Sequence, residues 1–148
     1  MLSLPRKTVL ALEAVLDIAY NARPEPVQAK RLTGRQGLGN RYLESAMQRL
    51  AREGILKGVR GPRGGYRLAR ERRRISVGDI VRALDQEETE DLPEPGSPLG
   101  QAVVEPLSRA IREAAMRQLD ALTLEDLCLR ARAAGIAGER DSGGDFEI

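Results

Sequence analysis

The spacing of apolar residues changes from helical to strand-like at Gly54, and this change restricts the fold more than any other feature. Before it, one apolar stripe runs along the predicted helix Arg41–Glu53: Tyr42, Leu43, Ala46, Met47 and Leu50. After it, Ile55–Val59 and Gly65–Leu68 fit short strands, and the turn residues between them indicate a hairpin. Gly54 stands where helices commonly end. The sequence therefore predicts a mainly α fold with a small β-hairpin.

Two more helices are predicted before this stripe. Apolar residues recur at helical spacing in Pro5–Asn21, and a shorter helix follows at Val27–Arg35. The turn Gln36–Asn40 contains two glycines and joins this short helix to the helix Arg41–Glu53. A helix, a helix-turn-helix and a hairpin in this order predict a winged helix-turn-helix.

The C-terminal part is predicted to be helical as well. Ser76 caps a fourth helix, Val77–Leu84, and Thr123 caps a last one, Leu124–Ala134. Between them, Leu99–Leu122 has the apolar spacing of a long helix that bends or restarts near Pro106. The expected segments are a winged helix-turn-helix domain (1–85), an acidic linker (86–98), two helices (99–137) and a disordered tail (138–148).

Charge is divided unevenly along the chain, although the net charge is only +2. Residues 1–85 carry 18 lysines and arginines against 8 acidic residues, whereas residues 86–148 carry 6 against 14. A basic half is typical of a protein that binds a polyanion. An arginine-rich, solvated surface would give the same count, so charge alone does not decide between the two.

Several classes of protein are disfavoured by the residue types. Glu13 and Asp17 interrupt the apolar run near the N-terminus, which argues against a membrane helix and a signal peptide. One cysteine and no disulfide framework are typical of the reducing cytoplasm. With no histidine, the chain shows no acid–base or metal-binding cluster at a recognisable spacing, so we do not expect an enzyme.

Polar side chains on the third helix can read DNA bases. The second helix of a helix-turn-helix lies in the major groove with its N-terminal residues at the base edges. The residues opposite the apolar stripe all have side chains that pair with bases: Asn40, Arg41, Glu44, Ser45 and Gln48. An ordinary solvated helix face is the alternative, but the turn before it and the hairpin after it favour DNA.

The stretch VRGPRGGYRLAR (Val59–Arg70) has the composition of a hairpin tip that enters the minor groove. Pro62 and its neighbouring glycines allow a tight turn and close approach, and Arg60 and Arg63 can enter the negative potential there. Other basic residues are expected to contact phosphates without reading sequence: Arg67, the run Arg70–Arg74, Lys30, Arg31 and Arg35. A nucleotide-binding loop is disfavoured because the GK[ST] ending is missing.

These motifs resemble one known family. RYLESAMQRLAREGILKGVRGPRGGYRLAR (Arg41–Arg70) and ISVGDIVRALD (Ile75–Asp85) are similar to the IscR/NsrR/CymR family of bacterial transcription regulators, the Rrf-two family. LTLEDL (Leu122–Leu127) resembles the C-terminal helix of that family more weakly. The resemblance implies a homodimer joined through Leu99–Leu122, and a palindromic operator on double-stranded DNA.

The resemblance also implies roles for individual residues. By matching position, Glu44 would read a base and Arg60 the minor groove. Arg41 stands where the family often has a smaller polar residue, which allows a preferred operator different from that of other members. A repressor is the expected mode of action, with an unknown small molecule or protein as effector and no membrane partner.

The chain departs from the family at the iron–sulfur cluster that many members carry. The resemblance places three cysteine ligands in and just after the loop that follows the fourth helix, but Gln86–Val104 contains no cysteine, and Ala102 stands about where the last would fall. Because such clusters need thiolates, occasionally with histidine, we expect no cluster and no other cofactor.

Cys128 is the single cysteine and allows two interpretations. It shares a helical face with Leu124, Leu127 and Ala131, which is typical of a buried, unreactive thiol. A redox sensor is the alternative. A regulator whose DNA binding depends on redox chemistry at Cys128, or on a partner protein, is therefore kept as the second hypothesis. A dimerising protein that has lost DNA binding is disfavoured by the basic helix and hairpin.

Overall fold

The computed structural model describes residues 3–21, 26, 40–62, 64–85 and 96–138. Its elements, in chain order, are α1 (Arg6–Asn21), α3 (Asn40–Arg52), β1 (Leu56–Val59), β2 (Gly65–Leu68), the 3₁₀ turn η1 (Arg72–Arg74), α4 (Val77–Leu84), the π-helical turn η3 (Gly100–Val104), α5 (Glu105–Asp120) and α6 (Leu124–Ala133). Within the described residues, the predicted helices and hairpin are present with bounds that agree closely, except at the start of the helix that follows the linker. The predicted helix Val27–Arg35, its turn, most of the acidic linker and nearly all of the tail lie outside the described residues.

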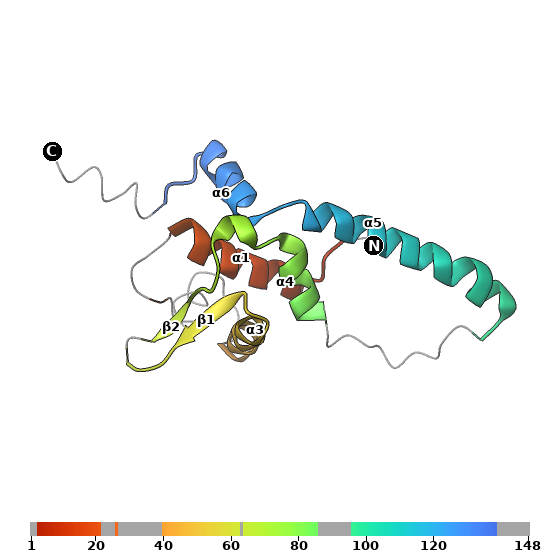
Figure 1. Ribbon diagram of the computed structural model, residues 1–148, viewed down its shortest axis with the longest axis horizontal. Coiled ribbons are helices and arrows are strands. Elements are labelled where there is room, and N and C mark those ends of the chain that lie inside the picture. The colour runs from red at the N-terminus through yellow and green to blue at the C-terminus, as the bar shows by residue number, and fades with distance from the viewer. Residues whose placement is uncertain (1–2, 22–25, 27–39, 63, 86–95, 139–148) are drawn as a thin grey trace.

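The core forms where α1, α3, α4 and α6 meet behind the hairpin (Figure 1). Its largest fully buried side chains come from these helices, from β1 and from the residues that connect the elements: Leu43, Met47, Leu50, Ile55, Leu56, Ile75, Ile80, Leu124 and Val15. The apolar stripe of α3 is thus turned inward, as its spacing predicted. This packing leaves the opposite face of α3 exposed beside the hairpin.

The hairpin is antiparallel and short. Gly58 lies opposite Tyr66, and Val59 lies opposite Gly65. At the turn, Gly61 has φ 111°, a backbone conformation that favours glycine. A Cβ on Gly64 would stand 2.1 Å from the carbonyl oxygen of Val59, so this position has no room for a side chain. The glycines therefore make the tip narrow, with Arg60 exposed beside it.

The starts of α4 and α6 are joined. Ser76 and Thr123 each form a capping box with the acidic residue three positions on, and the two residues form an antiparallel β-bridge. The amide of Val77 donates to the carbonyl of Leu122 at 2.8 Å. The C-terminal helix is therefore attached to the winged helix through backbone hydrogen bonds.

The segment after the linker is helical, as predicted, but it is not a regular α-helix throughout. It begins with the π-helical turn η3, and regular α-helix starts only at Glu105, whose amide donates to the carbonyl of Gly100. Pro106 lacks an N–H group and lies in the first turn of α5, where helices tolerate proline. The predicted break near Pro106 is thus a change of helix type. Figure 1 shows α5 extending away from the core as an arm.

The arm carries an exposed apolar row. Its large side chains are 42–71% exposed: Leu99, Val103, Val104, Leu107 and Ile111. A helix surface that faces only water rarely carries so many large apolar side chains in one row. Among the described helices, none is both long and apolar enough to cross a membrane.

Candidate nucleic-acid interface

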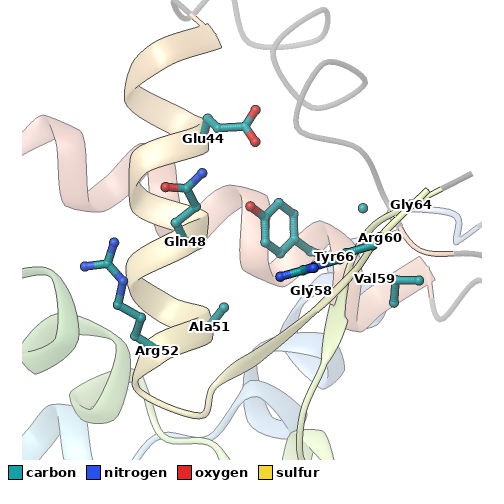
Figure 2. Close-up of a pocket in the computed structure, with 10 residues that line it drawn as sticks. Glu44, Gln48, Ala51, Arg52, Gly58, Val59, Arg60, Gly64 and Tyr66 are labelled. Atoms are coloured by element: carbon teal, nitrogen blue, oxygen red, sulfur yellow. The ribbon is translucent and has the colours of Figure 1, made fainter. Parts of the chain in front are cut away.

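A groove of about 680 Å³ separates the outer face of α3 from the hairpin (Figure 2). Glu44, Gln48 and Arg52 form its helical wall. They are four residues apart, so they lie one above another on a single face of α3. The hairpin supplies the other wall with Arg60 and the glycines of the turn. The groove thus brings polar side chains of the helix opposite the hairpin arginine.

Tyr66 lies between the two walls. Its ring is half-buried, and Figure 2 shows its hydroxyl pointing from β2 toward α3. The opposite residue on β1 is Gly58, and a Cβ there would meet the ring at 3.8 Å, an ordinary contact distance. The pKa of Tyr66 is raised, first by burial and then by the negative charge of Glu44. Tyr66 therefore keeps its proton and presents a hydrogen-bond donor to the groove.

The polar side chains of the groove have no hydrogen-bond or ion-pair partner among the described residues. In the described part of the chain, no hydrogen bond or ion pair is formed by the side chains of Glu44, Gln48, Arg52, Arg60 or Tyr66. Four arginines outside the groove are paired instead: Arg72 with Glu125, Arg73 with Glu71, Arg82 with Asp120 and Arg112 with Asp85. Unused hydrogen-bonding groups gathered along one groove are suited to bind a polar, charged ligand.

The structure brings only some of the predicted DNA-binding residues together. Glu44, Gln48 and Arg60 line the groove, and Arg41 is exposed in the first turn of α3. Arg67 is exposed on β2. Asn40 begins α3, but its side chain is not described, and Lys30, Arg31 and Arg63 lie outside the described residues.

Ser45 lies away from this groove. It lines a separate hollow with residues of α1 and of the end of α4, among them Lys7 and Leu84. Two residues of the groove, Arg52 and Tyr66, are absent from the residues that the sequence singled out as DNA-binding. The four-residue spacing from Glu44 and Gln48 would have indicated Arg52, whereas Tyr66 depends on the hairpin register.

Two arginines of the run after the hairpin, which was expected to contact phosphates, form contacts within the protein. Arg72 Nε lies 2.5 Å from Glu125 Oε2 and also reaches the carbonyl oxygen of Ala19, so it holds α6 and α1 to η1. Arg70 donates to the carbonyl oxygens of Gly54 and Arg74. This pairing favours a structural role for Arg72, whose partner lies 53 residues away in sequence, over the predicted phosphate contact.

Cys128 is buried in α6, only 4% exposed, and belongs to the core cluster. Burial raises the pKa of its thiol, and the nearby Arg72 guanidinium opposes this rise without reversing it. A buried thiol with a raised pKa is unreactive because the thiolate is the nucleophile. This environment favours the structural interpretation over the redox sensor.

The described residues contain no group of three or more histidines, cysteines and carboxylates that could hold a metal ion. The 148-residue sequence has one cysteine and no histidine. That donor set does not fit an iron–sulfur cluster, which needs several thiolates.

Comparison with known proteins identifies relatives of this chain. The family model described as "Rrf2: Iron-dependent Transcriptional regulator" matches residues 4–130. The HTH-type transcriptional regulator IscR of Escherichia coli O1:K1 is 40% identical over 76 residues, which are 51% of this chain and 47% of that protein. The alignment thus spans about half the length of this curated relative.

Solved structures extend the similarity over most of the chain. IscR of T. potens has a TM-score of 0.71 and 34% identity, covering 94% of this chain and 95% of the other. CymR (YrzC), the global cysteine regulator of B. subtilis, has a TM-score of 0.67 and 29% identity, covering 88% and 98%. The winged-helix fold and the helices that follow it are therefore shared with these regulators.

Proposed function

The chain belongs to the Rrf2 family of transcriptional regulators, and from this premise we propose that it represses transcription by binding a palindromic DNA operator as a homodimer. The observation that carries the proposal is the groove whose polar side chains have no partner within the described structure. These side chains are exposed to water in the free protein and are suited to bind base edges and phosphates.

In this proposal α3 enters the major groove. Arg41, Glu44 and Gln48 face away from the core and can pair with guanine, cytosine and adenine edges respectively. Asn40 and Ser45 belong to the same helix, and we propose them as further contacts. Arg60 and Arg63 at the hairpin tip would enter the adjacent minor groove. Lys30, Arg31 and Arg67 would contact phosphates.

The homodimer is proposed to form through the α5 arm. The exposed apolar row on η3 and α5 would be buried against the same row of a second copy, as in an isologous interface. A two-fold dimer presents two reading helices, so its operator would be an inverted repeat with half-sites spaced by whole turns of DNA. Binding over a promoter would then block transcription in the cytoplasm.

This regulator is proposed to work without an iron–sulfur cluster, because the chain lacks the thiolates. Its signal would be a small molecule or a partner protein acting on the C-terminal helices. The non-enzymatic role agrees with its relatives, which are transcriptional regulators.

The proposal is tested by selecting bound duplexes from a random-sequence DNA library. We expect one inverted repeat to be enriched, and sedimentation to give two protomers per duplex. Selection of a single half-site with one protomer would contradict the dimeric part, and no enrichment would contradict the proposal as a whole.

A further inference from the structure

The hollow beside Ser45, here called the α1–α3 hollow, lies on the other side of α3 from the hairpin. It is lined by the start of α1, one face of α3 and the end of the α4 segment, and its volume is about 170 Å³. Figure 1 shows α4 and the hairpin on opposite sides of α3. At about 30 Å³ per water molecule, the hollow holds about five waters, which is room for a phosphate group but not for a nucleotide.

DNA geometry determines what this hollow would meet. The major groove is bounded by the backbones of both strands, so a helix that lies in it has one sugar–phosphate backbone on each side. Ser45 follows Glu44 by one residue and therefore points about 100° around α3 from the row that faces the hairpin. If that row lies beside one backbone, the α1–α3 hollow would face the other. This step rests on the proposed function.

Thr8 supplies a buried hydroxyl to the hollow. The residue is only 8% exposed, and it lines the hollow from the first turn of α1. Within the described residues, its hydroxyl forms no hydrogen bond. A buried hydroxyl without a partner is unfavourable, so a group that enters the hollow and hydrogen-bonds with it would gain that interaction.

The backbone at the start of α1 adds further donors. The first helical hydrogen bond runs from the amide of Val9 to the carbonyl oxygen of Pro5 at 3.0 Å. The amides of Lys7 and Thr8 precede it and have no acceptor among the described residues. No acidic residue stands in the first turn of this 16-residue helix. Amides at the positive end of a helix dipole favour an anion.

The charged side chains of the hollow favour an anion as well. Lys7 Nζ lies 5.7 Å from the centre of the Tyr42 ring, and the Tyr42 hydroxyl donates to the carbonyl oxygen of Lys7 at 2.7 Å. Lys7 has no acidic partner in the part of the chain that the structure describes. Arg49 adds a guanidinium to the lining, whereas the carboxylate of Asp85 is paired with Arg112 at 2.5 Å. Two cations therefore face one carboxylate whose charge is already offset.

We propose that the α1–α3 hollow binds one phosphate of the DNA backbone on the side of α3 away from the hairpin. Lys7, the hydroxyl of Thr8 and the first-turn amides of α1 would hold its oxygens. The contact would fix the angle at which α3 lies in the major groove. It adds Lys7 and Thr8 to the interface, and neither of them reads a base.

The experiment uses the full chain and the operator duplex that wild type selects from random-sequence DNA. Lys7→Gln removes one charge per protomer and should weaken operator binding about tenfold. It should also reduce the slope of log affinity against log salt by about 2 for the dimer. Thr8→Val keeps the shape of the side chain and should weaken binding about tenfold without changing this slope, because the hydroxyl is neutral.

Replacing single phosphates by neutral methylphosphonates, at matching positions of both half-sites, tests whether the two residues share one phosphate. At one position, wild type, Lys7→Gln and Thr8→Val should bind the modified duplex with nearly equal affinity, because the lost partner is the same. Arg130→Gln, at an exposed site on α6, removes the same charge and should bind the unmodified operator like wild type. Equal urea midpoints would show that Thr8→Val is folded, and Lys7→Gln tests the site from an exposed position.

The results separate the two proposals. Specific operator binding by wild type, with Lys7→Gln and Thr8→Val unaffected, would overturn the phosphate contact and leave the proposed function standing. If inorganic phosphate then raises the unfolding midpoint of wild type but not of Lys7→Gln, the hollow binds a free phosphate instead of DNA. Losses in the two variants that persist at every methylphosphonate position would also overturn the contact. If wild type selects no duplex, both proposals fail.

Discussion

Asp120 at the end of α5 lies directly against Gly78 in the first turn of α4. A Cβ on Gly78 would stand 1.9 Å from Oδ1 of Asp120 and 3.1 Å from its backbone nitrogen. The same carboxylate pairs with Arg82, and Arg112 of α5 pairs with Asp85 just after α4 at 2.5 Å. The orientation of the arm relative to the winged helix is thus determined by a close contact with ion pairs on both sides.

Gly78→Ala is expected to lower the free energy of unfolding by about 1–2 kcal/mol, because Asp120 must move and its pair with Arg82 is lost. Replacing glycine by alanine within a helix would otherwise stabilise it. The double variant Gly78→Ala/Asp120→Ala removes the clash and should recover most of the loss in urea unfolding. No loss in the single variant would show that α4 and α5 are not in close contact.

Arg72→Ala should destabilise the fold while leaving DNA binding unchanged. Both side chains of the Arg72–Glu125 pair are about one-third exposed, so we expect a coupling energy of only about 0.5–1 kcal/mol in a double-mutant cycle with Glu125→Ala. Titration of labelled DNA at several salt concentrations would check the second part. A smaller salt dependence in Arg72→Ala would mean that this arginine contacts phosphate after all.

Arg60→Ala and Arg73→Ala should affect DNA binding in different ways. Loss of Arg60 should weaken operator binding by about 1–3 kcal/mol and relax sequence discrimination, since it would occupy the minor groove. Loss of Arg73, an exposed side chain paired with Glu71, should weaken operator and random DNA alike. Competition of operator with random duplex measures both effects. An equal loss of discrimination in the two variants would contradict this division.

Cys128 should react slowly with a thiol reagent in the native protein and quickly after unfolding, as measured by the rate of alkylation. Burial raises its pKa, so folding favours the protonated thiol. The resulting contribution to stability is complete below the unfolded pKa of about 8.5 and is lost as pH rises through the folded pKa. Cys128→Ala serves as control and should lack that pH dependence. Fast alkylation of Cys128 in the native protein at neutral pH would support the redox-sensor hypothesis instead.

The protein should stay colourless when it is purified without oxygen and supplied with iron and sulfide. One buried cysteine and no histidine do not provide the ligands of a cluster. Visible absorption together with stoichiometric bound iron would contradict this expectation.

Local signals in the sequence were enough to predict most of the described fold. Ser76 and Thr123 form the expected N-caps, and the change of apolar period at Gly54 marks the passage from α3 to the hairpin. Caps and periodicity depend on residues within one or two turns, so they can be read from the sequence without knowing the tertiary contacts.

The site was only partly predictable because its details depend on distant neighbours. Ser45 shares a helix with Glu44 but lies beside α1 and α4. Helix periodicity alone does not show which exposed residues of α3 face the hairpin and which face these two helices. Arg72 looked like a phosphate contact until its partner Glu125 was known. Tyr66 entered the groove only through its pairing with Gly58, which the hairpin register determines.

The central claim is that this groove reads a DNA sequence, and one measurement tests it most directly. Purified protein is mixed with fragmented genomic DNA from the source organism, and the retained fragments are sequenced at two salt concentrations. We predict that one inverted repeat is enriched and persists at the higher salt, because base contacts survive when phosphate contacts are screened. Uniform retention that disappears at the higher salt would contradict the claim, since it would show binding to phosphates alone.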